Sequence, residues 1–319
     1  MENMKLPQTA NGVTIVGLLK SKEFTTGADQ NGKVFMKGKL VVQVHEADGI
    51  SEISVNVKQN MMTSSGNENK LYKALQTVQK EYVTLDMVEA SKNQPLAEGQ
   101  QPLQADIVRI NGEYEQFRFA DGETGELVEI TRIKGTFINR LDDKNTPHSA
   151  TVDIEGYLKN IRNLEDGTIS FDLYPVNWAG TVSKYELKVV DPNLVPVFPT
   201  VYYEGCTAMM HGNIVNKAIV ENNGPAAFGS ASKNVITRYV RMIEVYGGQA
   251  PTQKLDPTLA EQAIEERKKE ELVIQASAQQ NKQGFPAGPG VENNNPFSGT
   301  LGAETNNPFA TGNPFATTN

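Results

Sequence analysis

One segment of the sequence, VFMKGKLVVQV (34–44), alternates apolar side chains with aromatic and basic ones. Successive side chains of a strand point to opposite faces, so Phe35, Lys37 and Lys39 share the face opposite the apolar residues. An aromatic ring can stack on a nucleic-acid base, and a lysine beside it can contact a phosphate. Exposed lysines on a sheet are more often solubilising, and phenylalanines are more often core residues. Because all three share one face, we interpret them as a nucleic-acid-binding set.

Further basic and aromatic residues occupy polar faces or loops of other strand-like segments. An aromatic ring can stack on any base, and an ammonium group can contact any phosphate. Such a set of residues therefore binds nucleic acid without sequence preference. The residues predicted to bind nucleic acid are Lys20, Lys22, Phe35, Lys37, Lys39, Arg132, Lys134, Tyr157, Lys159, Trp178, Lys184, Tyr185, Arg238 and Tyr239.

Catalytic and metal-binding patterns are missing from the sequence. The three histidines do not cluster, and Cys206 and His211 lack further ligands at zinc-like spacing. There is no Walker loop, G-x-S-x-G or H-E-x-x-H motif. We therefore expect no enzymatic activity, no catalytic residues, no metal and no cofactor.

The sequence motif of the strand that precedes this segment occurs twice in the chain. Residues 13–20 (VTIVGLLK) and 152–159 (VDIEGYLK) share the pattern V-x-I-x-G-x-L-K. A glycine inside a strand marks a bend or a close backbone approach, as a small closed barrel requires. A second echo, Ile-Thr-Arg at 130–132 and at 236–238, follows in the same order. Together the two echoes favour a duplicated domain over chance.

The periodicity of the first half predicts three strands, a helix and two more strands. Two strands lie within 10–45, with an Asn31-Gly32 hairpin turn between them, and the helix covers 67–82. The remaining first-half strands are expected at 50–58, 105–120 and 126–141, and the second-half strands at 152–161, 168–176, 181–190, 200–214 and 235–247. A helix between the third and fourth of five strands is the connectivity of an OB-fold. We predict a mainly β fold class with two tandem OB-fold-like five-stranded barrels.

Three segments resemble strands of a known family. VTIVGLLKS and VDIEGYLKN look like the first strand of bacterial SSB-type OB-folds, and VYYEGCTAM (201–209) looks like their fourth strand. The layout of two OB-like domains and a tail is similar to single-stranded-DNA-binding proteins of phages and mobile elements. The resemblance implies a partner, single-stranded DNA, and a role in DNA replication, recombination or repair.

The C-terminal region differs in composition from the rest. A charged helix with little apolar stripe is expected at 259–276, after an Asp256 N-cap, and residues 277–319 have too few apolar side chains to fold. The predicted domains are 1–148, 149–248, a linker and charged helix at 249–276, and a disordered tail at 277–319.

Three Asn-Pro-Phe triplets end the tail, and a tail without a core has no structural use for phenylalanine. We interpret the triplets as docking motifs for replication or recombination proteins, acting together through effective concentration. The docking residues are Asn295, Pro296, Phe297, Asn307, Pro308, Phe309, Asn313, Pro314 and Phe315. Asn-Pro-Phe is also read by EH domains, so a non-enzymatic interaction adaptor is an alternative, and a virion structural protein is another.

Composition constrains the setting of the protein. The net charge is −8, which is unusual for a nucleic-acid binder, so the argument depends on where the positive charges lie. A single cysteine, Cys206, excludes an internal disulfide and suggests a reducing compartment. The sequence shows neither a signal peptide nor a membrane span. We expect a cytoplasmic location, in the bacterial host if the protein is phage-encoded.

Overall fold

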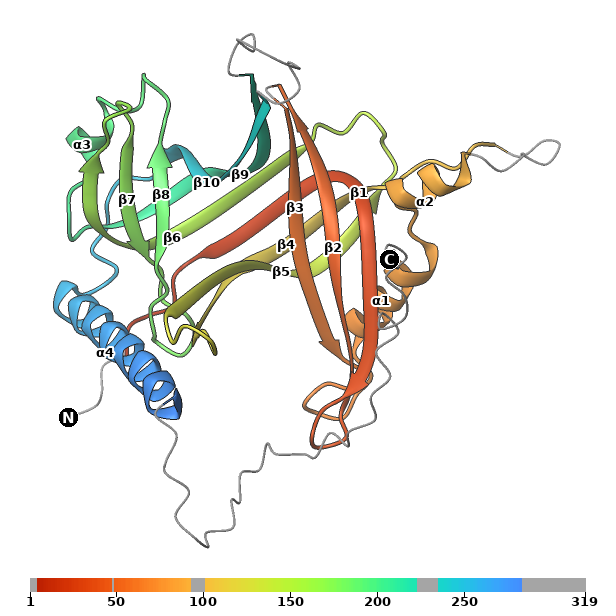
Figure 1. The fold of residues 1–319 in the computed structure, drawn as a ribbon, viewed down its shortest axis with the longest axis horizontal. Helices are drawn as coiled ribbons and strands as arrows, with labels where there is room; N and C mark the ends of the chain where they lie inside the picture. Colours follow the sequence, from red (N-terminus) through yellow and green to blue (C-terminus); the bar gives the residue numbers. More distant parts are fainter. Residues whose placement is uncertain (1–4, 48, 93–100, 223–234, 283–319) are drawn as a thin grey trace, which may run out of the picture. The chain divides into compact units, whose positions relative to one another are not determined.

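The computed structural model describes residues 5–47, 49–92, 101–222 and 235–282, and the fold is mainly β (Figure 1). Its strands are β1 (Asn11–Ala28), β2 (Val34–Glu46), β3 (Gly49–Asn60), β4 (Ile107–Ala120), β5 (Leu127–Leu141), β6 (Ser149–Asn163), β7 (Ile169–Tyr174), β8 (Tyr185–Val189), β9 (Thr207–Asn222) and β10 (Val235–Gly248). Its helices are α1 (Lys70–Glu81), α2 (Leu85–Ser91), α3 (Phe198–Val201) and α4 (Pro257–Lys282). Within these residues no helix is long and apolar enough to cross a membrane.

The strands pair in two closed circuits of the same order. In the first circuit β1 pairs with β2, β2 with β3, β3 in parallel with β5, β5 with β4, and β4 with β1. In the second, β6 to β10 repeat each pairing, including the parallel one between β8 and β10. Helices α1 and α2 lie between β3 and β4, as OB connectivity requires. The predicted fold class, two OB-fold-like barrels, is confirmed.

The two barrels are joined by their first strands. Strands β1 and β6 pair antiparallel, and Val13 lies opposite Val152, its counterpart in the repeated motif. Each of these valines also pairs with a glycine of its barrel's fourth strand, Gly112 or Gly212. The two motif copies therefore occupy equivalent positions on either side of a local two-fold relation, within one continuous sheet. Residues 1–278 form one compact unit, and the domain boundaries 1–148 and 149–248 stay a prediction.

The second sequence echo has no structural counterpart. Thr131 pairs with Gln116, a few residues beyond Gly112, whereas Thr237 pairs with Val220, which lies further beyond Gly212. The two Ile-Thr-Arg triplets are thus out of register with each other. The likeness of the barrels is carried by strand order and by the V-x-I-x-G-x-L-K motif.

The central glycine of that motif marks a close approach of two strands in both copies. A Cβ atom on Gly17 would lie 2.3 Å from the carbonyl oxygen of Gln43 in β2. A Cβ atom on Gly156 would lie 2.7 Å from the backbone nitrogen of Pro175, directly after β7. In each barrel the missing side chain lets the first strand curl against the second.

We expect Gly17→Ala to lower the free energy of unfolding by about 1–3 kcal/mol, because the methyl group meets backbone rather than a movable side chain. Urea denaturation followed by circular dichroism measures the change. Gly12→Ala is the matched control in the same strand, since its Cβ atom would meet nothing within 4 Å. Equal stability of the two variants would contradict the close-approach explanation.

Helix α4 is longer and better anchored than its sequence suggests. The predicted N-cap is confirmed, since Asp256 accepts a hydrogen bond from the Leu259 N–H at 3.0 Å. The apolar stripe of the helix is narrow, as predicted, but it is used in the first turns. There Ala260 and Ile264 are buried in a small core with Leu255 and residues of the second barrel. A narrow apolar stripe is enough to anchor the helix, because it packs against an apolar surface of the second barrel.

One helix and two boundaries also differ from the sequence prediction. The strand expected at 200–214 begins only at Thr207, because the short helix α3, with Pro199 in its first turn, takes up the start of that segment. Helix α2 was not predicted, and Thr84 caps it by accepting from the Met87 N–H at 3.1 Å. The predicted tail begins too early, since α4 extends to Lys282. Residues 283–319, and with them the Asn-Pro-Phe triplets, lie outside the described residues.

Candidate nucleic-acid interface

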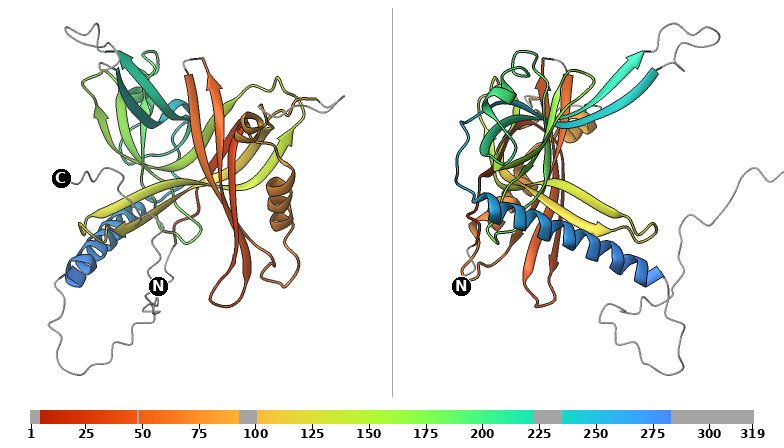
Figure 2. Two further views of the ribbon diagram at one scale, coloured as in Figure 1. Left: turned by 45° about the vertical axis from the view of Figure 1, so that its right-hand side comes forward. Right: turned by 90° about the vertical axis from the view of Figure 1, so that its left-hand side faces the viewer.

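A groove of about 960 Å³ crosses the outer face of the first barrel. Its lining residues come from β1, β2 and β3 and from the β4–β5 hairpin. Figure 2 shows these strands from two sides. The basic and aromatic residues that line it are Phe35, Lys37, Lys39, Lys58, Phe117, Arg132 and Lys134. Five of these were predicted from the sequence; Lys58 and Phe117 were not.

The face of β2 is the one that its alternation predicts. Met36 and Leu40 are buried, whereas Lys37 and Lys39 are exposed and Phe35 is half-buried. Across the ladder Lys37 pairs with Lys58 of β3, so the cations of the two strands lie side by side. This two-stranded face carries three lysines and one aromatic ring, and Lys58 is the lysine that contacts the ring.

Two contacts between a cation and a ring lie within the groove. Lys58 Nζ lies 4.7 Å from the ring centroid of Phe35, and Arg132 Cζ lies 3.7 Å from that of Phe117. Phe117 remains 39% exposed, which is unusual for a phenylalanine. Each pair offers a base a flat ring and offers its phosphate a cation at the same place. The alternation of β3 could have revealed Lys58, because it points away from the buried Val55 and Val57.

Acidic residues compensate only part of the groove's positive charge. Lys134 lies 2.9 Å from Glu113 and 3.0 Å from Glu115, and Arg132 lies 3.4 Å from Glu115. Burial lowers the pKa of Lys134, but the hydrogen bonds to these carboxylates outweigh it and raise the pKa, so the ammonium stays charged. Among the described residues, neither Lys37 nor Lys39 forms an ion pair. These two lysines are available to phosphates.

Two predicted lysines of β1 lie outside the groove and have structural partners. Lys20 Nζ lies 2.5 Å from Glu52, whose hydrogen bond raises the lysine pKa. Lys22 Nζ donates to the carbonyl oxygens of Val78 at 3.0 Å and Gln79 at 2.7 Å, so it caps the last turn of α1. Burial lowers the pKa of Lys22. Strand parity placed both on the outer face, but it could not show that a helix end covers that face.

Three predicted residues of the second barrel, Tyr157, Lys159 and Tyr185, are engaged within the protein. Tyr157 and Tyr185 are 3% and 4% exposed, so the expectation that their rings face solvent is wrong. Tyr157 donates to Glu261 of α4 at 3.1 Å, and Lys159 lies 2.6 Å from the same carboxylate. Helix α4 thus covers the outer side of β6.

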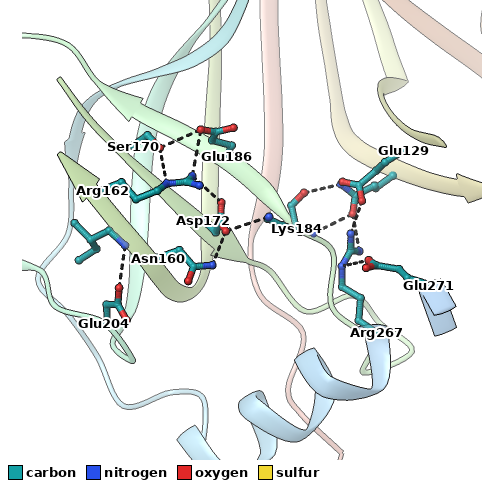
Figure 3. A network of polar contacts seen from close by, with 12 residues as sticks. Glu129, Asn160, Arg162, Ser170, Asp172, Lys184, Glu186, Glu204, Arg267 and Glu271 are labelled. Atoms are coloured by element: carbon teal, nitrogen blue, oxygen red, sulfur yellow. Dashed lines mark hydrogen bonds and ion pairs between the residues drawn. The ribbon is translucent and has the colours of Figure 1, made fainter. Parts of the chain in front are cut away.

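Carboxylates also neutralise the face made by β7 and β8. Asp172, which is buried, lies 3.1 Å from Lys184 and 3.4 Å from Arg162, and Arg162 also contacts Glu186 (Figure 3). In the first barrel the corresponding cross-strand pair is Val41 and Ser54. The short strands β7 and β8 also lack the extension that carries Lys37 and Lys58. The duplication predicted two similar faces, but among the described residues Arg162 and Lys184 of the second barrel pair with carboxylates, whereas Lys37 and Lys39 of the first barrel do not.

Of the three remaining predicted residues, Trp178 does not line the groove. Trp178 is 78% exposed in the loop between β7 and β8. Arg238 and Tyr239 belong to a part of β10 whose side chains are outside the described residues.

The described residues hold no group of three or more His, Cys, Asp or Glu side chains that could bind a metal ion. Cys206 is buried, and burial raises the pKa of its thiol. The thiol is therefore a weak nucleophile at neutral pH.

Solved structures with some likeness to the chain are single-stranded DNA binding proteins. The wild-type protein of Thermus aquaticus is 13% identical over 77% of this chain and 95% of its own, with a TM-score of 0.44. The small single-stranded DNA-binding protein of Streptomyces coelicolor is 10% identical over 41% of this chain and 94% of its own, with a TM-score of 0.22. These likenesses are too distant to carry an argument about this chain.

Two comparisons of the sequence itself complete the picture. No curated protein matches the chain. The family model named YorF matches residues 9–283, which include both barrels and all of α4. The chain belongs to the YorF family.

Proposed function

We propose that the protein is a non-enzymatic, sequence-nonspecific binder of single-stranded DNA and that the groove of the first barrel is its binding site. The observation that carries this proposal is the placement of two cation–aromatic pairs and the lysines of β2 in one open groove. Base stacking contributes about 1–3 kcal/mol per base and does not depend on the base. The lysines add affinity that depends on salt.

The rings favour a single strand over a duplex. In a duplex the base faces are stacked on one another, so Phe35 and Phe117 could reach them only by unstacking. DNA rather than RNA is the proposed ligand, and the test below distinguishes them.

Binding should be measured by the fluorescence anisotropy of labelled oligo-dT, the corresponding duplex and the matched RNA, at several salt concentrations. We expect the single-stranded DNA to bind more tightly than the duplex, with an affinity that falls as salt rises. Failure of all three to bind at low salt would overturn the proposal. Tighter binding of RNA than of DNA would show that the ligand of the groove is single-stranded RNA.

We further propose that the protein acts in DNA replication or recombination in the cytoplasm and that its Asn-Pro-Phe triplets recruit partner proteins. The support is the repetition of one apolar residue in a fixed Asn-Pro context, three times within residues 295–315. Origin in a phage or mobile element stays a prediction from the layout. An interaction adaptor that uses the same triplets is the alternative, and it requires no affinity for oligonucleotides.

Deletion of residues 290–319 should leave oligo-dT affinity unchanged, because the groove lies wholly within the first barrel. The same deletion should abolish recruitment of a partner. Replacing Phe297, Phe309 or Phe315 singly with Ala should weaken recruitment only in part, since the other triplets keep the effective concentration high. Pull-downs with full-length and truncated protein measure the difference. Identical partner lists would show that the triplets are not docking sites.

A further inference from the structure

A second, smaller groove of about 240 Å³ adjoins the first one. Both grooves are lined by Glu115, Phe117 and Lys134 of the β4–β5 hairpin. The two grooves therefore join into one continuous path along the surface, which we call the course. The far side of the smaller groove is formed by the loop between β7 and β8 and by residues before β1. It therefore leads from the first barrel to the second.

Trp178 lies at the far end of this course. Its side chain is 78% exposed, although burying an indole stabilises a protein more than burying almost any other side chain. Lys5 Nζ lies 5.7 Å from the ring centroid and donates to the Trp178 carbonyl oxygen. A cation and an open ring are thus held together here, as they are at Phe35 and Phe117.

The loop that presents Trp178 is ordered by its own hydrogen bonds. Asn177 Oδ1 accepts from the N–H groups of Ala179 at 2.8 Å and Thr181 at 3.1 Å. Thr9 anchors the base of the loop, since Val176 N–H donates to its hydroxyl at 2.8 Å. The tryptophan is therefore presented by a fixed turn, which lowers the entropy lost when a base stacks on it.

The described residues contain four contacts between a cation and a ring, and three of them lie along the two grooves. The fourth, between Arg140 and Tyr82, belongs to the packing of α1. The order along the course is Lys58–Phe35, Arg132–Phe117 and Lys5–Trp178. Such a row of rings, each with its own cation, suits a chain in which bases and phosphates alternate.

We infer that a bound single strand continues from the groove of the first barrel past Phe117 and Lys134 onto Trp178, with Lys5 at a phosphate. The second barrel then contributes one stacking platform to a shared site instead of a site of its own. This inference rests on the proposed function and adds the route of the ligand. A short strand fills only the first groove, and a longer one reaches Trp178.

The chain has a single tryptophan, so Trp178 fluorescence reports this platform alone. Oligo-dT of increasing length, from about 4 to about 16 nucleotides, should be added while two signals are followed. The anisotropy of a label on the oligonucleotide reports binding anywhere on the protein. We expect the shortest bound oligonucleotides to change anisotropy with little effect on Trp178, and the longer ones to quench it.

Substitutions of Trp178 then distinguish a role in base stacking from a role in maintaining the structure. Trp178→Ala should weaken binding of the longer oligonucleotides about 5- to 150-fold and leave the shortest unchanged. Trp178→Phe should restore most of the loss, because it keeps a ring. Tyr203→Ala is the control, since Tyr203 is an aromatic residue of the second barrel, 61% exposed, outside both grooves.

The outcomes distinguish this inference from the proposed function. If no length changes the anisotropy, the proposed function fails and the route fails with it. If the anisotropy changes but Trp178 is unaffected at every length, the route alone is overturned. Equal quenching by the shortest and longest oligonucleotides would also overturn it, because Trp178 would then belong to the first site that is filled.

Discussion

The variant Lys37→Ala/Lys39→Ala/Lys58→Ala should bind oligo-dT with a much weaker dependence on salt than the wild type. Each phosphate contact on a single strand contributes about 0.7 to the slope of log K against log [salt], so losing three removes about 2. If the two proteins bind equally at about 1 M salt, the variant is about 500-fold weaker at about 50 mM. Anisotropy titrations at several salt concentrations give both slopes.

The control removes the same charge from elsewhere. In Lys80→Ala/Lys92→Ala/Lys188→Ala the three lysines lie outside the groove, on α1, after α2 and on β8. Its salt slope should equal that of the wild type. Equal slopes for the two triple variants would show that binding responds to net charge and not to the groove.

Loss of the groove's rings should weaken binding at every salt concentration. Phe35→Ala and Phe117→Ala should each cost about 1–3 kcal/mol of binding free energy, and their salt slopes should stay close to the wild-type value. Ring stacking does not release counterions, whereas loss of a lysine contact does. The two kinds of variant are therefore separable by slope.

Phe137→Ala is the matched control for the rings. Phe137 is 53% exposed on β5 and does not line the groove. Thermal unfolding of all three variants accompanies the binding data, because Phe35 is half-buried. If Phe35→Ala unfolds the barrel while its folded fraction binds normally, Phe35 is a core residue.

The alternation of side chains along β2 predicted which of its residues line the groove. Alternation along β2 placed Phe35, Lys37 and Lys39 on the outer face, and the neighbouring strand carries the same signal at Lys58. Glycine positions and the repeated motif predicted two barrels of one connectivity. These inferences succeeded because they depend on local backbone geometry.

Long-range packing explains where the sequence prediction failed. Parity shows which face a residue occupies but not what covers that face. Lys22 meets the end of α1, and Tyr157 and Lys159 meet Glu261 of α4. Phe117 belongs to the site only because the β4–β5 hairpin borders the groove. None of these contacts has a periodic signal.

The duplication itself misled the site prediction. Two copies of one motif suggested two binding faces, but the motif contains core residues and a bend, not the outer face. The outer positions diverged freely, and the second barrel acquired Asp172 and Glu186 where the first has Val41 and Ser54. In the described part of the chain, equivalent strands therefore carry a groove with unpaired lysines in one barrel and an ion-pair network in the other.

Lysine acetylation in the presence and absence of oligo-dT, read by mass spectrometry, tests the central claim most directly. Bound DNA should protect Lys37, Lys39 and Lys58 of the first barrel. Lys80 and Lys188 should react at the same rate with and without DNA. Protection of Lys184 and Lys188 in the second barrel, with Lys37 and Lys39 still reactive, would contradict the account.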